Sequence, residues 1–189
     1  MFLTSGTFVR SRLVLAGGVA LVTAVQGIAT IASKSERWVG HWPSTSAAVG
    51  WATLWGACIA AGATAWVVAA PRRDRYHPFV LASSRPQSQI YRGGLLSVTA
   101  GSLVGYGTVT GYAIWMTGVR ASVGGPDVLE LLTAFAAVPM AVGIGAAVGK
   151  VIPAALAPVV AAVAPYVIYM CLLYTCRSPR RWDRGVATT

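Results

Sequence analysis

The sequence predicts an all-α integral membrane protein, a polytopic bundle of about five transmembrane helices with a short cytoplasmic amphipathic helix. The 189 residues are 56% hydrophobic and only 11% charged, and the mean hydropathy is +0.64. Soluble domains carry about 25% charged residues because their surface faces water. The charges are also clustered, which leaves long uncharged stretches, and a bilayer needs about 20 apolar residues per helical crossing.

Apolar segments suited to cross a membrane recur along the chain. They are expected approximately over residues 13–32, 47–70, 95–119, 128–149 and 153–175. Together they define a transmembrane domain over 1–175, with a cytoplasmic loop at 71–93 and a basic C-terminal tail at 176–189. The first apolar run is too long for a signal peptide and no small-residue cleavage site follows it, so it is expected to remain as a crossing.

Prolines and tryptophans set further expectations. Pro71 and the charges after it are expected to end the second segment. Pro139 is expected to kink the fourth. Trp38 and Trp42 lie in a polar loop, and they are expected to anchor it at the membrane interface, with each ring half in the headgroup layer.

Lysine and arginine counts predict the topology. With the N-terminus inside, eight of these residues fall on the cytoplasmic side and three in the outer loops. The four arginines of the tail conflict with this, because five crossings place them outside. Either the fifth segment does not fully cross, or a further crossing has been lost. The net charge of +10 is interpreted as topology and contact with anionic lipid, not as nucleic-acid binding.

The loop at 71–93 has a distinctive middle. An apolar patch, Phe79 to Leu81, is followed by Ser83, Ser84, Arg85 and Pro86. This pattern is typical of a short amphipathic helix that lies along the cytoplasmic surface and ends near the proline.

Residues for catalysis or metal binding do not form a recognisable pattern. His41 and His77 are expected on opposite sides of the membrane, and no zinc, thiol or paired-carboxylate spacing occurs. Lys150 follows glycines, as in a phosphate loop, but Val151 stands where that loop needs Ser or Thr. The sequence therefore predicts that the chain is not an enzyme and holds no metal or other cofactor. Any ATP would bind to a partner.

Two kinds of residue remain as candidates for function or packing. Glu130 lies near a helix start, where the helix dipole favours an anion. An interfacial helix-start residue is the favoured interpretation, and a transport or proton-relay role is the alternative. Glycines of the third and fourth segments are expected to let helices approach closely: Gly101, Gly105, Gly107, Gly111, Gly145 and Gly149.

Two stretches resemble ABC-2-type transporter permeases of the actinobacterial type. Residues 70–91, APRRDRYHPFVLASSRPQSQIY, are similar to that family's basic intracellular loop after the second crossing. Residues 124–166 are similar to its outer Gly-Pro loop, Gly-rich fourth helix, basic turn and Ala-Pro-rich fifth helix. The resemblance extends over about residues 10–174, and its motifs are patterns of composition and spacing.

The resemblance implies a permease subunit of an ATP-driven exporter in the cell membrane. It implies two partners: an ABC ATPase subunit, which binds the ATP, and a second permease chain. It also implies a coupling helix at 76–88 that docks into the ATPase. The candidate docking residues are Tyr76, Phe79, Val80, Leu81 and Arg85.

The family has six crossings, whereas five are expected here before the arginine-rich tail. A non-transporting accessory, immunity or assembly protein that kept the fold is therefore the alternative function. A membrane-embedded enzyme is a weaker third, because the sequence offers no intramembrane nucleophile and base.

Overall fold

The computed structural model describes residues 3–33, 35–73, 87–120 and 124–176. Within these ranges the chain is helical and contains no strand, so the predicted all-α membrane bundle is confirmed. The helices are α1 (Leu3–Ala32), α2 (Ser35–Trp38), α3 (Trp42–Arg73), α5 (Gln87–Gly118), α6 (Val128–Val151) and α7 (Ala157–Cys176). Residues 76–86 of the predicted amphipathic coupling helix lie outside the described residues, and its last two residues, Gln87 and Ser88, belong to α5.

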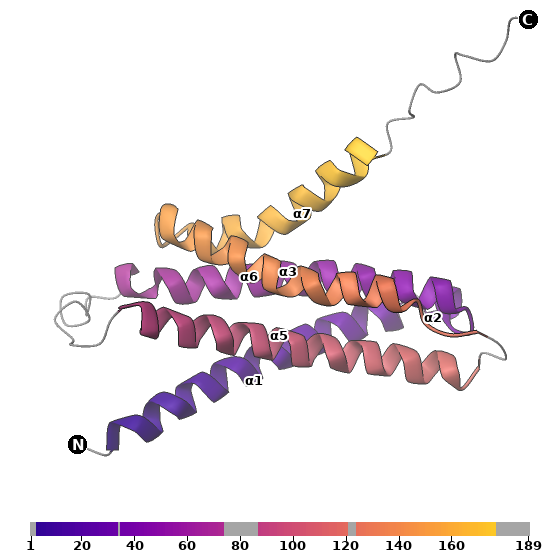
Figure 1. Cartoon of the computed structure of the whole chain (residues 1–189), viewed down its shortest axis with the longest axis horizontal. Coiled ribbons are helices and arrows are strands. Elements are labelled where there is room, and N and C mark those ends of the chain that lie inside the picture. Colours follow the sequence, from indigo (N-terminus) through magenta and orange to yellow (C-terminus); the bar gives the residue numbers. More distant parts are fainter. Residues whose placement is uncertain (1–2, 34, 74–86, 121–123, 177–189) are drawn as a thin grey trace, which may run out of the picture.

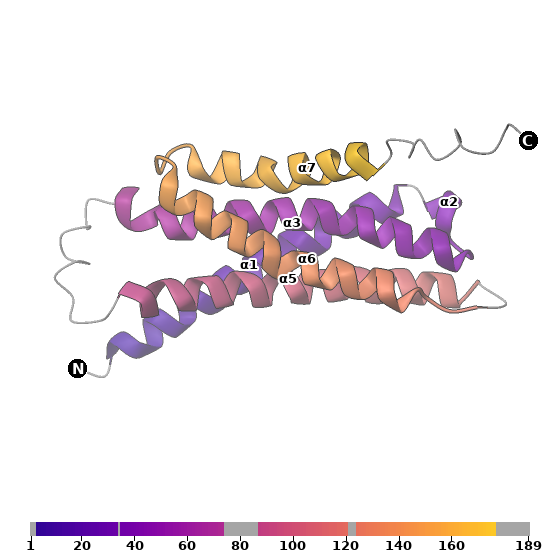
Figure 2. The same cartoon turned by 45° about the horizontal axis from the view of Figure 1, so that its top comes forward.

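The long helices run side by side along one axis (Figures 1 and 2). Helix α3 is central, since it contacts α1, α5, α6 and α7. Helix α1 packs mainly on α5, and α6 packs mainly on α3. Helix α7 leaves the axis of the bundle toward its C-terminal end (Figure 1). Helix α1 starts at one end of the bundle, and α7 runs from near that end toward the other (Figures 1 and 2).

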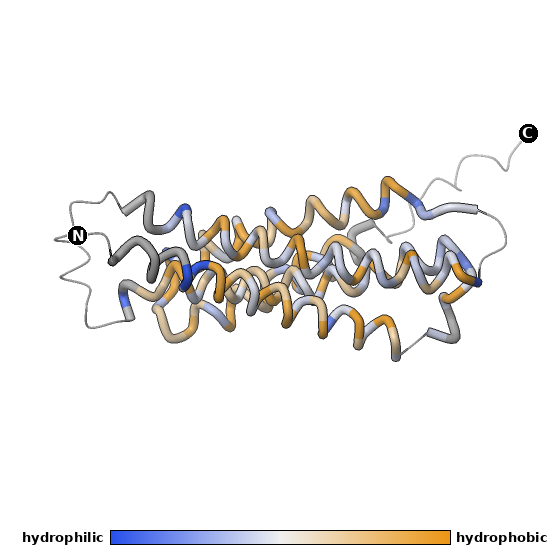
Figure 3. Tube along the Cα trace, turned by 90° about the horizontal axis from the view of Figure 1, so that it is seen from below, coloured by the Kyte–Doolittle hydropathy of each residue, from blue (hydrophilic) through white to orange (hydrophobic). Residues whose placement is uncertain are grey.

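Three of the described helices are long and apolar enough to cross a membrane: α1 over Arg10–Ala32, α3 over Trp42–Ala70, and α6 over Val128–Val151. The apolar part of α7, Ala157–Leu172, is shorter. Helix α5 has 32 residues, but its many Gly, Ser and Thr residues make it less apolar. Strongly hydrophilic residues lie mostly toward the two ends of the bundle (Figure 3). This distribution is that of a membrane protein.

Prolines shift several helix boundaries from their expected positions. The part of α3 suited to cross a membrane ends at Ala70, as predicted, but the helix itself continues through Pro71 to Arg73, two residues beyond the predicted stop. It also begins at Trp42, earlier than expected, because Pro43 is tolerated in a first helical turn. Residues Pro153 to Leu156 form a turn instead of helix, and α7 starts at Ala157. Pro158 then occupies the first turn, where no N–H is needed.

Trp38 is not an interfacial anchor, as the sequence suggested, but a buried core residue. Its side chain is 3% exposed. It packs in a cluster with Ile31, Val49 and Tyr106. The indole Nε1 donates a hydrogen bond to the Ile31 carbonyl at 2.9 Å. That carbonyl is at the end of α1, where helix geometry leaves acceptors unpaired, so Trp38 both caps α1 and fills the core.

A buried hydroxyl pair links α3 to α5. Thr45 Oγ1 and Thr117 Oγ1 are 2.8 Å apart, and Thr45 Oγ1 also lies 3.0 Å from the His41 carbonyl. The buried hydroxyl of Ser102, in contrast, has no hydrogen-bond partner among the described residues.

We expect Thr45→Val to lower the free energy of unfolding by about 1–2 kcal/mol, because it breaks this link and leaves the Thr117 hydroxyl buried alone. Ser102→Ala, the control, should change it by less than about 0.5 kcal/mol or raise it, since a buried hydroxyl without a partner contributes nothing. Denaturant titration of the purified protein measures both. Equal losses for the two variants would show that the Thr45–Thr117 contact does not stabilise the bundle.

Candidate functional site

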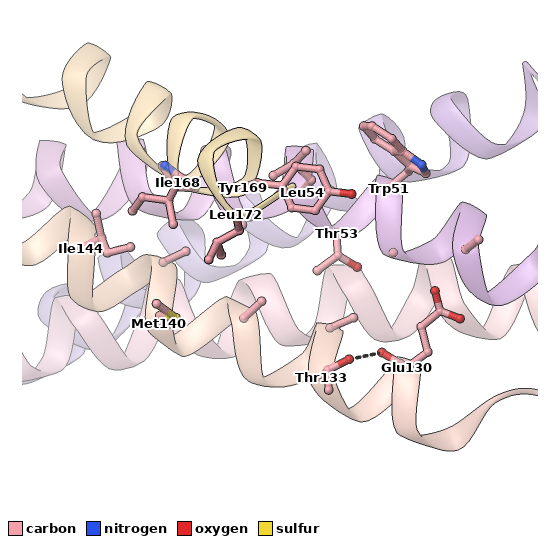
Figure 4. Close-up of a pocket in the computed structure, with 17 residues that line it drawn as sticks. Trp51, Thr53, Leu54, Glu130, Thr133, Met140, Ile144, Ile168, Tyr169 and Leu172 are labelled. Atoms are coloured by element: carbon pink, nitrogen blue, oxygen red, sulfur yellow. Dashed lines mark hydrogen bonds between the residues drawn. The ribbon is translucent and has the colours of Figure 1, made fainter. Parts of the chain in front are cut away.

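A cavity between α3, α6 and α7 is the best-formed candidate site in the described part of the chain (Figure 4). Its volume is about 460 Å³, within the range of small-molecule sites. Most of the wall is apolar, and a few polar groups reach into it. The larger side chains that line it are Trp51, Thr53, Leu54, Glu130, Thr133, Met140, Ile144, Ile168, Tyr169 and Leu172.

Residue size explains why α7 separates from α3 on one side of the cavity. Near the start of α7 the helices touch closely, and a Cβ placed on Gly62 would lie 3.2 Å from the Pro158 carbonyl oxygen. Small residues fill this contact: Ala57, Ala61, Ala65, Ala157 and Ala161.

Farther along α7, aromatic pairs occupy the space between the two helices. The rings of Trp51 and Tyr169 meet edge to face with centroids 5.7 Å apart. Those of Trp55 and Tyr166 stack at 6.1 Å. Small side chains at one end and large rings at the other form a wedge, and the cavity lies along it.

Helix α6 forms the opposite wall and is held by its glycines. A Cβ on Gly145 would overlap the Ala61 backbone, and one on Gly149 would lie 3.0 Å from the Ala65 Cα. At the other end of α6, the Glu130 carboxylate lies over Gly50, where an added Cβ would be 3.7 Å from Oε1. The acid therefore lies at the α3–α6 seam, on the edge of the cavity (Figure 4).

The other predicted packing glycines fall into two groups. Gly101 and Gly105 meet α1, at Ala16 and at Ala20 with Thr23 respectively. Gly107 and Gly111 meet no atom within 4 Å of an added Cβ, so within the described chain they pack against no other helix.

The predicted ATPase-docking residues cannot be placed, because Tyr76, Phe79, Val80, Leu81 and Arg85 lie outside the described residues. The helix ends that border this segment are described. Arg72 donates hydrogen bonds to the Lys150 carbonyl at 2.9 Å and to the Gly149 carbonyl, which ties the end of α3 to the end of α6. The Arg12 guanidinium fills the space beside Gly93 at the start of α5. Arginines thus connect the helix ends at this basic end of the bundle.

Trp51 and Tyr169, which line the cavity, are functional candidates that the sequence did not single out. Trp51 and Trp55 are four residues apart, and Tyr166 and Tyr169 are three apart, so the two residues of each helix share one helix face. Periodicity does not reveal which helices face each other, so the contact between the pairs was not predictable. Within the described ranges, His, Cys, Asp and Glu do not gather in groups of three that could hold a metal ion.

Comparison with known proteins does not assign the chain to a family. No protein-family model, curated protein or solved structure matches it. The function is therefore argued from the cavity and from its connection to the basic end of the bundle.

Proposed function

We propose that this protein is a membrane-spanning permease subunit of an ATP-driven, ABC-2-type exporter in the cell membrane. It works with a separate ATPase subunit, which carries the ATP, and with a second permease chain. The observation that supports this best is the course of α3. One part of this helix lines the cavity with Trp51, Thr53 and Leu54, and its end leads into the basic segment where the ATPase is proposed to dock.

The hydrogen bonds of Arg72 can transmit a movement from this segment to both walls of the cavity. They fasten α3 to the last carbonyls of α6, and α6 is the opposite wall of the cavity. A force on the segment after α3 therefore acts on both walls. Rigid-body displacement of packed helices is a common way to couple distant sites, and it gives the ATPase a route to open or close the cavity.

The distribution of charge supports the orientation that we propose. Arg10 and Arg12 lie near the start of α1, Arg72 at the end of α3, Arg92 near the start of α5 and Lys150 at the end of α6. The positive-inside rule puts this end in the cytoplasm, together with the N-terminus. Glu130 and the wider part of the cavity then belong to the outer half of the membrane. Gly107 and Gly111, four residues apart and uncovered on α5, offer a surface for the second permease chain.

Co-purification with the ATPase encoded nearby tests the proposal. Replacing both Phe79 and Leu81 with glutamate should abolish the complex. Burial of each side chain is worth about 1.5–3 kcal/mol, so the double change should weaken association at least about a hundredfold.

The control replaces Ser83 and Ser84 with glutamate. This variant should retain most of the ATPase binding, because it adds the same charges and loses no apolar side chain. A tight complex that survives the Phe79 and Leu81 changes would refute docking through this segment. A chain that captures no ATPase at all would favour the alternative, a non-transporting accessory, immunity or assembly protein.

A further inference from the structure

The carboxylate of Glu130 lies in the first turn of α6, where the helix dipole favours a negative charge, but it does not cap the helix. Asp127 already caps α6, and its Oδ1 accepts hydrogen bonds from Leu129 N at 3.0 Å and Glu130 N at 3.3 Å. Glu130 itself uses its backbone carbonyl to accept from Thr133 Oγ1 at 2.8 Å. Its side chain lines the cavity and forms no ion pair or hydrogen bond with the side chains that the structure describes.

Aromatic rings border the same cavity. Trp51 and Tyr169 both line it and hold each other edge to face, and Figure 4 shows them on the wall across from Thr133. The face of a Trp or Tyr ring attracts a cation because the π electrons give it negative potential. A carboxylate adds full negative charge, and the two features together disfavour an anion.

The rest of the wall is suited to an apolar body. Leu54, Met140, Ile144, Ile168 and Leu172 line it, and its volume of about 460 Å³ accommodates a molecule of several rings or a branched chain. A ligand complementary to the whole lining of the cavity is therefore apolar over most of its surface and positively charged at one point.

The geometry points to this cavity as a binding site for hydrophobic organic cations, with Glu130 as the counter-charge and Trp51 and Tyr169 as the aromatic wall. This inference rests on the proposed exporter function and names the substrate class of that exporter. The apolar body lies between α3, α6 and α7, and the cationic centre lies toward Glu130.

Binding of tetraphenylphosphonium to the purified full chain tests the inference, with tetraphenylborate as an anion of matched shape. The cation should bind and the anion should bind at least about tenfold more weakly, because only the cation gains from the carboxylate and the rings. Glu130→Gln should weaken cation binding at least about tenfold, since it removes the charge and keeps the shape. Trp51→Leu should weaken it about fivefold.

Asp127→Asn is the matched control. It removes one negative charge three residues from Glu130, and asparagine is a good helix cap, so cation binding should stay within about twofold. Circular dichroism and size-exclusion chromatography establish that each variant is folded.

Equal affinity of the wild type and Glu130→Gln for the cation, or stronger binding of the borate by the wild type, would overturn the inference. Equal affinity of the two proteins would mean that the cavity holds an uncharged apolar molecule such as a lipid chain, and stronger binding of the borate would mean that it favours a hydrophobic anion. Because this assay uses the chain without its ATPase, its failure is separate from the failure of co-purification, which concerns the exporter function.

Discussion

Replacing Gly145 with alanine is expected to push α6 away from α3 and to lower the free energy of unfolding by about 3 kcal/mol. The new Cβ would overlap the carbonyl oxygen of Ala61 and lie 2.9 Å from its carbonyl carbon. These are backbone atoms of the central helix, so they cannot rotate away as a side chain would. One of the two helices must shift, and the other α3–α6 contacts loosen with it.

Gly143→Ala is the matched control, two residues away on the same helix. A Cβ there meets no atom within 4 Å, so it should stabilise α6 by up to about 1 kcal/mol through the higher helix propensity of alanine. Denaturant titration in detergent compares the two variants. If Gly145→Ala were as stable as Gly143→Ala, the close backbone contact of α3 and α6 would be refuted.

Replacing Trp38 with alanine is expected to lower the free energy of unfolding by about 3–5 kcal/mol, because it removes a large buried side chain. The change also removes the indole N–H that binds the Ile31 carbonyl. Trp38→Phe should lose less, since it keeps most of the apolar volume and gives up that hydrogen bond.

Trp115→Ala on α5 is the control for this prediction. Trp115 is 65% exposed, against 3% for Trp38, so its removal should cost less than about 1 kcal/mol. Thermal unfolding followed by tyrosine and tryptophan fluorescence ranks the variants. Similar losses at the two positions would mean that Trp38 acts as an interfacial anchor, as the sequence alone suggested, and not as a core residue.

Helix boundaries show where sequence reasoning loses precision. The sequence predicts a stop at Pro71 because proline lacks an N–H and clashes with the preceding turn, yet α3 runs to Arg73. The turn before α7 is a different case: Pro153 begins this turn, and Pro158 fits the first turn of a helix better than its interior.

The candidate site was only partly visible in the sequence. Glu130 was singled out because it lies near a helix start, where the helix dipole favours an anion, but its position over Gly50 was not predictable. That placement depends on how α6 packs against α3, which the backbone contacts of Gly145 and Gly149 decide. The glycine pattern on α5 was equally ambiguous: Gly101 and Gly105 meet α1, whereas Gly107 and Gly111 face no helix of the described chain.

The sequence by itself determined the fold class, because a low content of clustered charges and long apolar runs suit helices in a bilayer and little else. It also determined which residues are small enough for close helix contact. The tertiary structure alone decided which helices use those contacts, and that Trp38 enters the core. It also placed Glu130, Trp51 and Tyr169 around one cavity. The physical reason is that hydropathy and periodicity act along one helix, whereas a cavity depends on the packing of side chains between helices far apart in the sequence.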